Sequence, residues 1–248
     1  MTPTDRTAPD SFPPATAHGP LLPVSDGVHC VRGTFKIGPG IVISRTMTVV
    51  ATPDGLVVVS SVRLDAGGEA ALAQLGRVAH VVALSDAHGK DDPYYVKTFG
   101  AAFWSVPGAK PQGLPVDRVL GRVPGAEQPV PGGRFILIDN PGRPEGALWL
   151  PHGGGTLVTC DAIQNHADKS GASFLARVMT PLMGFTGGVI VPRLWRRVHK
   201  VAPPAVAPTF AAIAGLEFEN LVTAHGPPVI GGAAQRVRAA LAALAPSA

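Results

Sequence analysis

The chain has 248 residues, of which 46% are hydrophobic and 15% charged, so it can bury a large core within one domain. Its net charge of +4 is mild and only 6% of its residues are aromatic, which argues against a basic, aromatic-lined groove for nucleic acid. No run of about 18 apolar residues occurs, so we expect no membrane span.

Residues 1–22 are rich in Pro, Thr and Ala and contain no apolar signal region. We expect them to form a disordered lead-in to a single folded domain at 23–248. The two cysteines, Cys30 and Cys160, are more typical of buried residues in a reducing compartment than of a disulfide framework, although a single bridge stays open. The expected location is therefore the cytoplasm.

The first half of the domain is predicted as a β-meander that passes into strand–helix–strand units. Strands are expected at 28–37, 41–51, 56–62, 78–84 and 102–106, and helices at 69–75 and 94–99. The alternation of strands and helices in the later part indicates parallel pairing.

The second half repeats the order of strands before helices. A Pro- and Gly-rich loop is expected at 107–131, then strands at 134–139, 147–150, 156–159 and 220–223, with helices at 209–215 and 233–244. Two sheets with helices on their outer faces would satisfy this pattern.

Residues 162–207 are predicted as a helical insertion or lid. Within it, 174–197 mixes large apolar side chains with a basic cluster and forms one helix or two, with a break at Gly187 and Gly188. Three interpretations stay open: a hydrophobic lid over a site, a helical hairpin that forms a homodimer through 170–200, and a segment that rests on a membrane surface.

Polar side chains gather where apolar strands end, at four places along the chain. These places are 84–92, 140–146, 157–162 and 221–226. Because strand ends at one edge of a sheet converge on the same crevice, we expect the four places to meet. Imidazole and carboxylate groups at such a crevice can hold Zn²⁺ or iron.

In this order, the four places resemble the metal motifs of the metallo-β-lactamase superfamily. Those motifs are His-x-His-x-Asp-His after a strand, a Gly-His-Thr-x-Gly-like turn, an Asp at a strand end and a His-Gly near the C-terminus. The resemblance covers roughly residues 27–230 and implies a four-layer αββα sandwich, with two mixed sheets between outer helices. It places His88, Asp161 and His225 at ligand positions.

The other ligand positions carry different residue types. Asp86 stands at the first His position, Lys90 at the Asp position, and Arg143 at the His of the turn. Asp91 stands at the last His position and is expected as a substitute ligand, with Asp92 in its place if the register shifts by one.

Two fixed cations change the metal chemistry expected of this site. Arg143 cannot lose its proton, and Lys90 adds a second charge unless its pKa is strongly lowered. Both disfavour a pair of divalent ions, and both can pair with the nearby carboxylates instead. We therefore expect one ion, zinc or else iron or manganese, or none.

The sequence favours a metal-dependent, hydrolase-like protein for a small ester, lactone or similar substrate. The expected metal ligands are His88, Asp91, Asp161 and His225. The expected catalytic residues are Asp86, Lys90 and Arg143. A loop carboxylate that the metal leaves free, such as Asp86, is expected as general base, and Arg143 or Lys90 as the oxyanion stabiliser.

Alternatives stay open beside this interpretation. The chain can be a non-catalytic binding or scaffold protein that kept the fold without the metal. It can also be a metal-free enzyme in which Lys90 is the base or nucleophile. Asp161 can instead be a helix N-cap, because it follows an apolar strand, although the resemblance favours a role in the site.

Overall fold

The computed structural model describes residues 12–110, 114–123, 126–138, 140 and 143–244. Within these residues the first sheet has seven strands, in the order β1 (Leu22–Ser25), β2 (Val28–Gly38), β3 (Ile41–Thr52), β4 (Gly55–Val59), β5 (Val78–Ala83), β6 (Ala102–Ser105) and β7 (Arg118–Val119). In the same described part, the second sheet has five, in the order β14 (Val229–Ile230), β13 (Asn220–Thr223), β10 (Thr156–Thr159), β9 (Glu145–Leu150) and β8 (Arg134–Ile138). Two short strands, β11 (Gln164–Asn165) and β12 (Val189–Ile190), pair separately.

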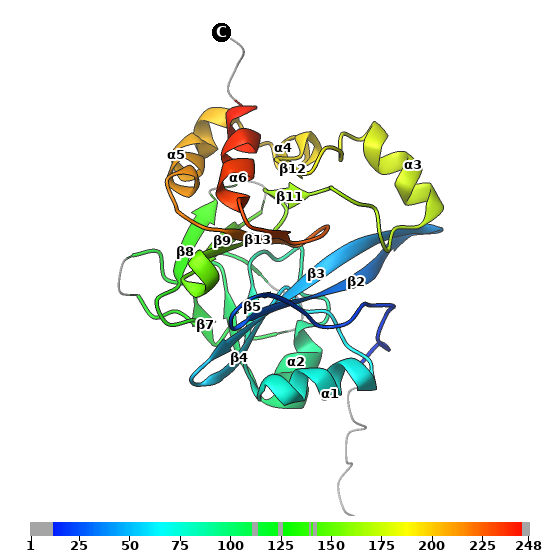
Figure 1. Cartoon of the computed structure of the whole chain (residues 1–248), viewed down its shortest axis with the longest axis vertical. Coiled ribbons are helices and arrows are strands. Elements are labelled where there is room, and N and C mark those ends of the chain that lie inside the picture. Colours follow the sequence, from blue (N-terminus) through cyan, green and yellow to red (C-terminus); the bar gives the residue numbers. More distant parts are fainter. Residues whose placement is uncertain (1–11, 111–113, 124–125, 139, 141–142, 245–248) are drawn as a thin grey trace, which may run out of the picture.

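Helices cover the outer faces of both sheets (Figure 1). The helices are α1 (Ala66–Leu75), α2 (Asp92–Phe99), α3 (Phe174–Leu182), α4 (Arg193–Val198), α5 (Pro203–Ala214) and α6 (Ala233–Ala242), with a short 3₁₀ turn at His152–Gly154. Leu72 of α1 and Tyr95 of α2 pack on the first sheet, while Trp195 of α4 and Phe210 of α5 pack on the second. The architecture is the αββα sandwich that the sequence predicts.

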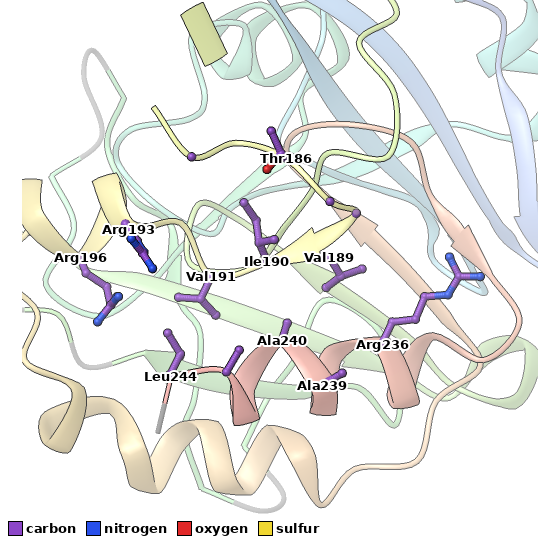
Figure 2. A pocket seen from close by; sticks show the side chains of 14 residues that line it. Thr186, Val189, Ile190, Val191, Arg193, Arg196, Arg236, Ala239, Ala240 and Leu244 are labelled. Atoms are coloured by element: carbon purple, nitrogen blue, oxygen red, sulfur yellow. The ribbon is translucent and has the colours of Figure 1, made fainter. Parts of the chain in front are cut away.

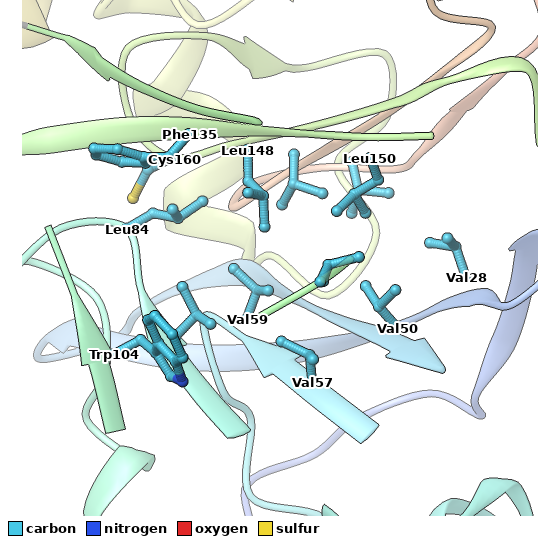
Figure 3. Close-up of a cluster of buried hydrophobic side chains, with 14 of the residues drawn as sticks. Val28, Val50, Val57, Val59, Leu84, Trp104, Phe135, Leu148, Leu150 and Cys160 are labelled. Atoms are coloured by element: carbon cyan, nitrogen blue, oxygen red, sulfur yellow. The ribbon is translucent and has the colours of Figure 1, made fainter. Parts of the chain in front are cut away.

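The central core lies between the two sheets. Val57, Val59 and Trp104 of the first sheet face Leu148 and Leu150 of the second (Figure 3). Val-rich strands suit this position, since β-branched side chains pack well on a pleated surface that is buried on both faces. The core fixes the relative position of the two sheets, and with it the strand ends that carry the polar loops.

The strand pairing follows the predicted change from meander to parallel units. β2, β3 and β4 are antiparallel, whereas β4, β5, β6 and β7 run parallel. In the second sheet, β10 and β13 are also parallel, with Thr159 opposite Thr223. Parallel neighbours end at the same edge, which brings their following loops together.

Some predicted elements differ from the structure. The loop predicted at 107–131 contains β7, whose two residues are exposed and form no apolar run. The segment 174–197 forms two helices, α3 and α4, which is one of the two alternatives expected for it; the strand β12, which was not expected, lies between them. The last helix before β13 begins at Pro203 rather than at residue 209, because proline is well tolerated in a first helical turn.

The lead-in predicted as disordered is partly built into the first sheet. Residues 1–11 lie outside the described residues, but 12–22 are placed. His18 bridges to Gly33, and the Thr16 hydroxyl donates to the carbonyl oxygen of Thr34 at 2.8 Å. Backbone pairing therefore orders a segment whose composition alone indicates disorder. None of the described helices is long and apolar enough to cross a membrane.

Candidate functional site

The polar loops meet at one edge of the sandwich, as the strand order requires. Asp161 and His225 each follow, by two residues, the paired ends Thr159 and Thr223 of the parallel strands β10 and β13. His88 lies in the loop that follows β5 in the other sheet. The three predicted ligand positions are therefore brought together by strands from both sheets.

Two imidazoles converge on one carboxylate. His88 Nε2 lies 3.1 Å from Asp161 Oδ2, and His225 Nε2 lies 3.2 Å from Asp161 Oδ1. The two rings are edge to face, with their centroids 5.1 Å apart. We call these three residues the His–Asp–His centre.

Neighbouring backbone holds His225 in place. Its Nδ1 donates to the carbonyl oxygen of Ser44 at 2.7 Å, so Nε2 is the nitrogen that faces Asp161. Gly226, which follows it, has a positive φ of 88°, and a Cβ there would collide with the carbonyl of Asn165. The loop that carries His225 thus packs between β3 and β11. Metal-binding histidines in proteins are commonly oriented by a carbonyl that accepts from the other ring nitrogen, as the Ser44 carbonyl does here.

Asp161 and the neighbouring imidazoles change the ionisation of the centre. Desolvation acts to raise the pKa of Asp161, but His88 and His225 hold that pKa well below its usual value. Desolvation likewise acts to lower the pKa of His225, but the Asp161 carboxylate and the Ser44 carbonyl raise it overall. The Asp161 carboxylate therefore stays ionised between the two imidazoles.

A cysteine lies directly behind the centre. The ligand atoms of His88, Cys160 and Asp161 lie within 4.8 Å of one another. Cys160 is fully buried in the central core, where burial and then the neighbouring carboxylates Asp161 and Glu145 raise the pKa of its thiol (Figure 3). A thiol whose pKa is raised resists conversion to the thiolate that binds a metal, so the candidate ligands for one divalent ion are His88, Asp161 and His225.

The opposite side of the site is filled by ion pairs. Asp86 Oδ1 lies 2.8 Å from Arg143 Nε, and Lys90 Nζ lies 5.2 Å from the centre of the Phe35 ring. The Arg143 guanidinium sets a permanent positive charge beside the carboxylate that would replace the first histidine, and Lys90 adds an ammonium group to the same side. The residues present therefore do not fit a second divalent ion.

Asp91 does not join the His–Asp–His centre, contrary to the ligand role expected of it. Its carboxylate accepts from the Arg45 guanidinium and, at 2.8 Å, from the backbone N–H of Arg63. Asp92 is the first residue of α2; its side chain accepts from the Ser61 hydroxyl at 2.5 Å, and burial raises its pKa to about 7. Both carboxylates stabilise the start of α2 against the first sheet.

An apolar pocket of about 360 Å³ opens beside the centre. Ser44, Asp161, His166 and His225 form its polar end. Its apolar walls come from β2 and β3 (Ile37, Ile41, Ile43), from α3 and the loop after it (Met179, Met183, Phe185) and from α4 (Leu194, Trp195, Val198). A smaller hollow of about 210 Å³ lies on the other side of Asp161, where Lys90 and His88 line it. Much of the pocket lining thus comes from residues between 164 and 199.

Sequence reasoning missed Glu145, which is buried beneath the centre. Its Oε1 accepts from the backbone N–H of Ala162 at 2.5 Å, and its Oε2 from the Trp195 indole at 2.8 Å. Burial, and then the nearby Asp161 charge, raise its pKa to about 8. The signal was present, since Glu145 is a carboxylate at the start of a strand that is otherwise apolar.

Solved structures provide the comparison with known proteins, since no protein-family model and no curated protein sequence matches the chain. A metallo-β-lactamase from Erythrobacter litoralis is similar over 90% of this chain and 92% of its own, with a TM-score of 0.54 and 13% identity. FIM-1 from Pseudomonas aeruginosa, in its mono-zinc form, is similar over 94% and 99%, with a TM-score of 0.54 and 17% identity.

A metallo-β-lactamase from Hirschia baltica is similar over 91% of this chain and 98% of its own, with a TM-score of 0.55 and 12% identity. The likeness extends over nearly the whole of each chain, although few residues are identical. It confirms the architecture that the four motifs predict: the chain has the metallo-β-lactamase fold.

Proposed function

We propose that the chain is a hydrolase that uses one divalent metal ion, zinc in the first place, and acts on a small ester or lactone with an apolar part. The observation that carries this proposal is the convergence of His88 and His225 on Asp161 at the polar end of an apolar pocket. Similarity to FIM-1 in a mono-zinc form supports a single ion in this fold.

In this proposal each residue has a defined part. His88, Asp161 and His225 hold the ion, which when bound lowers the pKa of a water and polarises a carbonyl. The Ser44 carbonyl fixes the ring of His225, and the walls contributed by α3 and α4 exclude water from the apolar part of the substrate.

The cationic side of the site binds negative charge. Lys90 lines the hollow beside His88 and Asp161, so it can approach an oxyanion formed there. Asp86 is paired with Arg143 and positions that guanidinium, in place of the general-base role expected from the sequence. Asp91 has a structural role because it is held by Arg45 and by the Arg63 amide.

Metal content and ester hydrolysis test the proposal together. The whole chain, purified without chelator, is expected to hold close to one equivalent of zinc and to hydrolyse a short-chain nitrophenyl ester. Asp161→Asn should lose both properties, whereas Asp54→Asn, an exposed carboxylate in a turn, should keep both. Less than about a tenth of an equivalent of zinc, iron or manganese would overturn the proposal.

A second function, binding without catalysis, is favoured by the ion pairs. Asp86 with Arg143 and Asp91 with Arg45 neutralise the loop carboxylates with no metal present. This alternative predicts the same melting temperature with and without chelator. A chelator-induced fall of several degrees would exclude it, because a bound ion stabilises the folded state.

A further inference from the structure

A stripe of large apolar side chains is exposed along α3. Phe174 is 82% exposed and Leu182 is 84% exposed, at the two ends of the helix. Between and beside them the exposed apolar residues are Leu175, Val178, Met179 and Met183. These positions recur every four residues on one side of the helix, so they form a continuous apolar surface rather than isolated side chains.

The apolar pocket opens within this stripe. Met179 and Met183 both line the pocket and are exposed, and so are Ile37 at the tip of β2 and Val198 at the end of α4. Figure 1 shows α3 and α4 along the same side of the molecule, above the sheets. We call this surface, with the basic residues of 169–200, the α3–α4 face.

The charge of the α3–α4 face has one sign. From residue 169 to residue 216 the sequence contains no Asp or Glu, and its basic residues are Lys169, Arg177, Arg193, Arg196, Arg197 and Lys200. Among the described residues, none of these six forms an ion pair with a carboxylate. The face therefore presents uncompensated positive charge around apolar side chains.

A hollow of about 720 Å³ adjoins the stripe where α3 ends. Gly184 is among its lining residues. Arg193 and Arg196 of α4 lie at one end of the hollow, and Arg236 of α6 lies at the other (Figure 2). The Nε of Arg196 is buried and has no hydrogen-bond partner among the described residues. Guanidinium groups around a hollow are suited to phosphate oxygens.

We propose that the α3–α4 face binds the surface of a membrane that contains anionic phospholipids, with the apolar stripe inserted among the acyl chains and the arginines on the headgroup phosphates. Amphipathic helices with a basic polar rim bind in this way, through apolar burial together with electrostatic attraction. The mouth of the apolar pocket then opens toward the lipid.

Charge favours a lipid surface over a second copy of the chain. In a two-fold dimer the same patch occurs on both subunits, so the basic residues of one copy would approach those of the other. An anionic membrane removes that repulsion and also accepts the apolar stripe. The proposal concerns binding alone and stands whether or not the chain hydrolyses an ester.

Sedimentation with vesicles tests the proposal on the full chain. Vesicles of phosphatidylcholine and phosphatidylglycerol in equal parts are expected to bind the protein, and vesicles of phosphatidylcholine alone to bind it weakly. Phe174→Ser and Leu182→Ser should each lower partitioning roughly tenfold, since each removes a large apolar side chain from the contact. Arg193→Gln, Arg196→Gln and Arg197→Gln should each lower it about fivefold on the anionic vesicles.

A matched control carries the same kinds of change elsewhere. Val119→Ser with Arg122→Gln removes an exposed apolar side chain and a positive charge away from the face, and it should bind like the unmodified chain. Because Phe174 and Leu182 are more than four-fifths exposed, their variants should unfold at an unchanged temperature.

Two results would overturn the proposal. One is equal partitioning of the unmodified chain and the α3 and α4 variants on anionic vesicles. The other is a dimer in light scattering that Phe174→Ser with Leu182→Ser dissociates, in a chain that does not bind vesicles, which would assign the face to self-association. Because no turnover is measured, neither result bears on ester hydrolysis.

Discussion

The carboxylates on the two sides of the site have different partners: imidazoles on one side and guanidinium groups on the other. On one side, Asp161 lies between the imidazoles of His88 and His225 and remains open to the apolar pocket. On the other, Asp86 is covered by Arg143, and Asp91 by Arg45. One side keeps donors that a metal can use, whereas the other supplies permanent cations. The carboxylates on both sides thus have a partner that can balance their charge. Only the partners of Asp161 are imidazoles, which can lose a proton and bind a metal instead, whereas arginine keeps its charge.

The largest effect is expected when metal-binding side chains replace the cations on the ion-paired side, because this change should remove the difference between the two sides. Asp86→His combined with Arg143→His and Lys90→Asp removes both cations and adds two imidazoles and a carboxylate. We expect the variant to bind a further equivalent of zinc, which elemental analysis measures. No gain over the unmodified chain would show that the ion pairs are not what limits metal binding.

Removing an imidazole from the open side should weaken metal binding. His225→Ala deletes a donor whose ring is already oriented by Ser44, so we expect zinc affinity to fall roughly a hundredfold or more. Competition with a chromogenic chelator measures this affinity. His152→Ala, in the turn between β9 and β10, is the control and should leave the affinity unchanged.

The pH dependence of stability tests the ionisation of Asp92, the third carboxylic acid of the loop after Asp86 and Asp91. Burial raises the pKa of Asp92 from 3.8 to about 7, so between these values the folded chain holds a proton that the unfolded chain has released. The free energy of unfolding should therefore fall as pH rises from about 4 to about 7, by up to about 4 kcal/mol from this group.

Asp92→Asn removes this ionisable group but retains an amide oxygen that can accept from Ser61. We expect urea unfolding of this variant to vary less with pH and to be more stable than the unmodified chain above pH 7. A pH dependence identical to that of the unmodified chain would contradict the assignment.

The smallest effect on stability is expected when the ion pair between Asp86 and Arg143 is removed. The Arg143 side chain is 43% exposed, so Arg143→Ala should change the free energy of unfolding by less than about 1 kcal/mol. Thermal unfolding measures this change. A loss of several kcal/mol would mean that the ion pair supports the fold rather than only occupying the site.

The sequence predicts the residues of the His–Asp–His centre because the strand topology around them is simple. His88, Asp161 and His225 follow apolar strands, and parallel strands must end at one edge. The strands at 156–159 and 220–223 agree residue for residue with β10 and β13, since each is a short apolar run between loops.

What the sequence does not predict depends on contacts across long distances in the chain. Asp91 pairs with Arg45 of β3, and no local pattern indicates that the two will meet. Glu145 lies between Ala162 and Trp195, which come from different elements. The sequence also leaves the exposure of Phe174 and Leu182 undecided, because the periodicity of a helix does not show whether its apolar side faces protein or solvent.

Gly226 has a consequence for how other chains with this fold are screened. Its positive φ and the Asn165 carbonyl beside it demand glycine for packing, independently of any ion. A His-Gly pair near the C-terminus can therefore persist in homologues that bind no metal, so it is weak as a marker of metalloenzymes. Screening should instead ask whether Lys or Arg occupies the other expected ligand positions, where the motif resemblance places Lys90 and Arg143 of this chain.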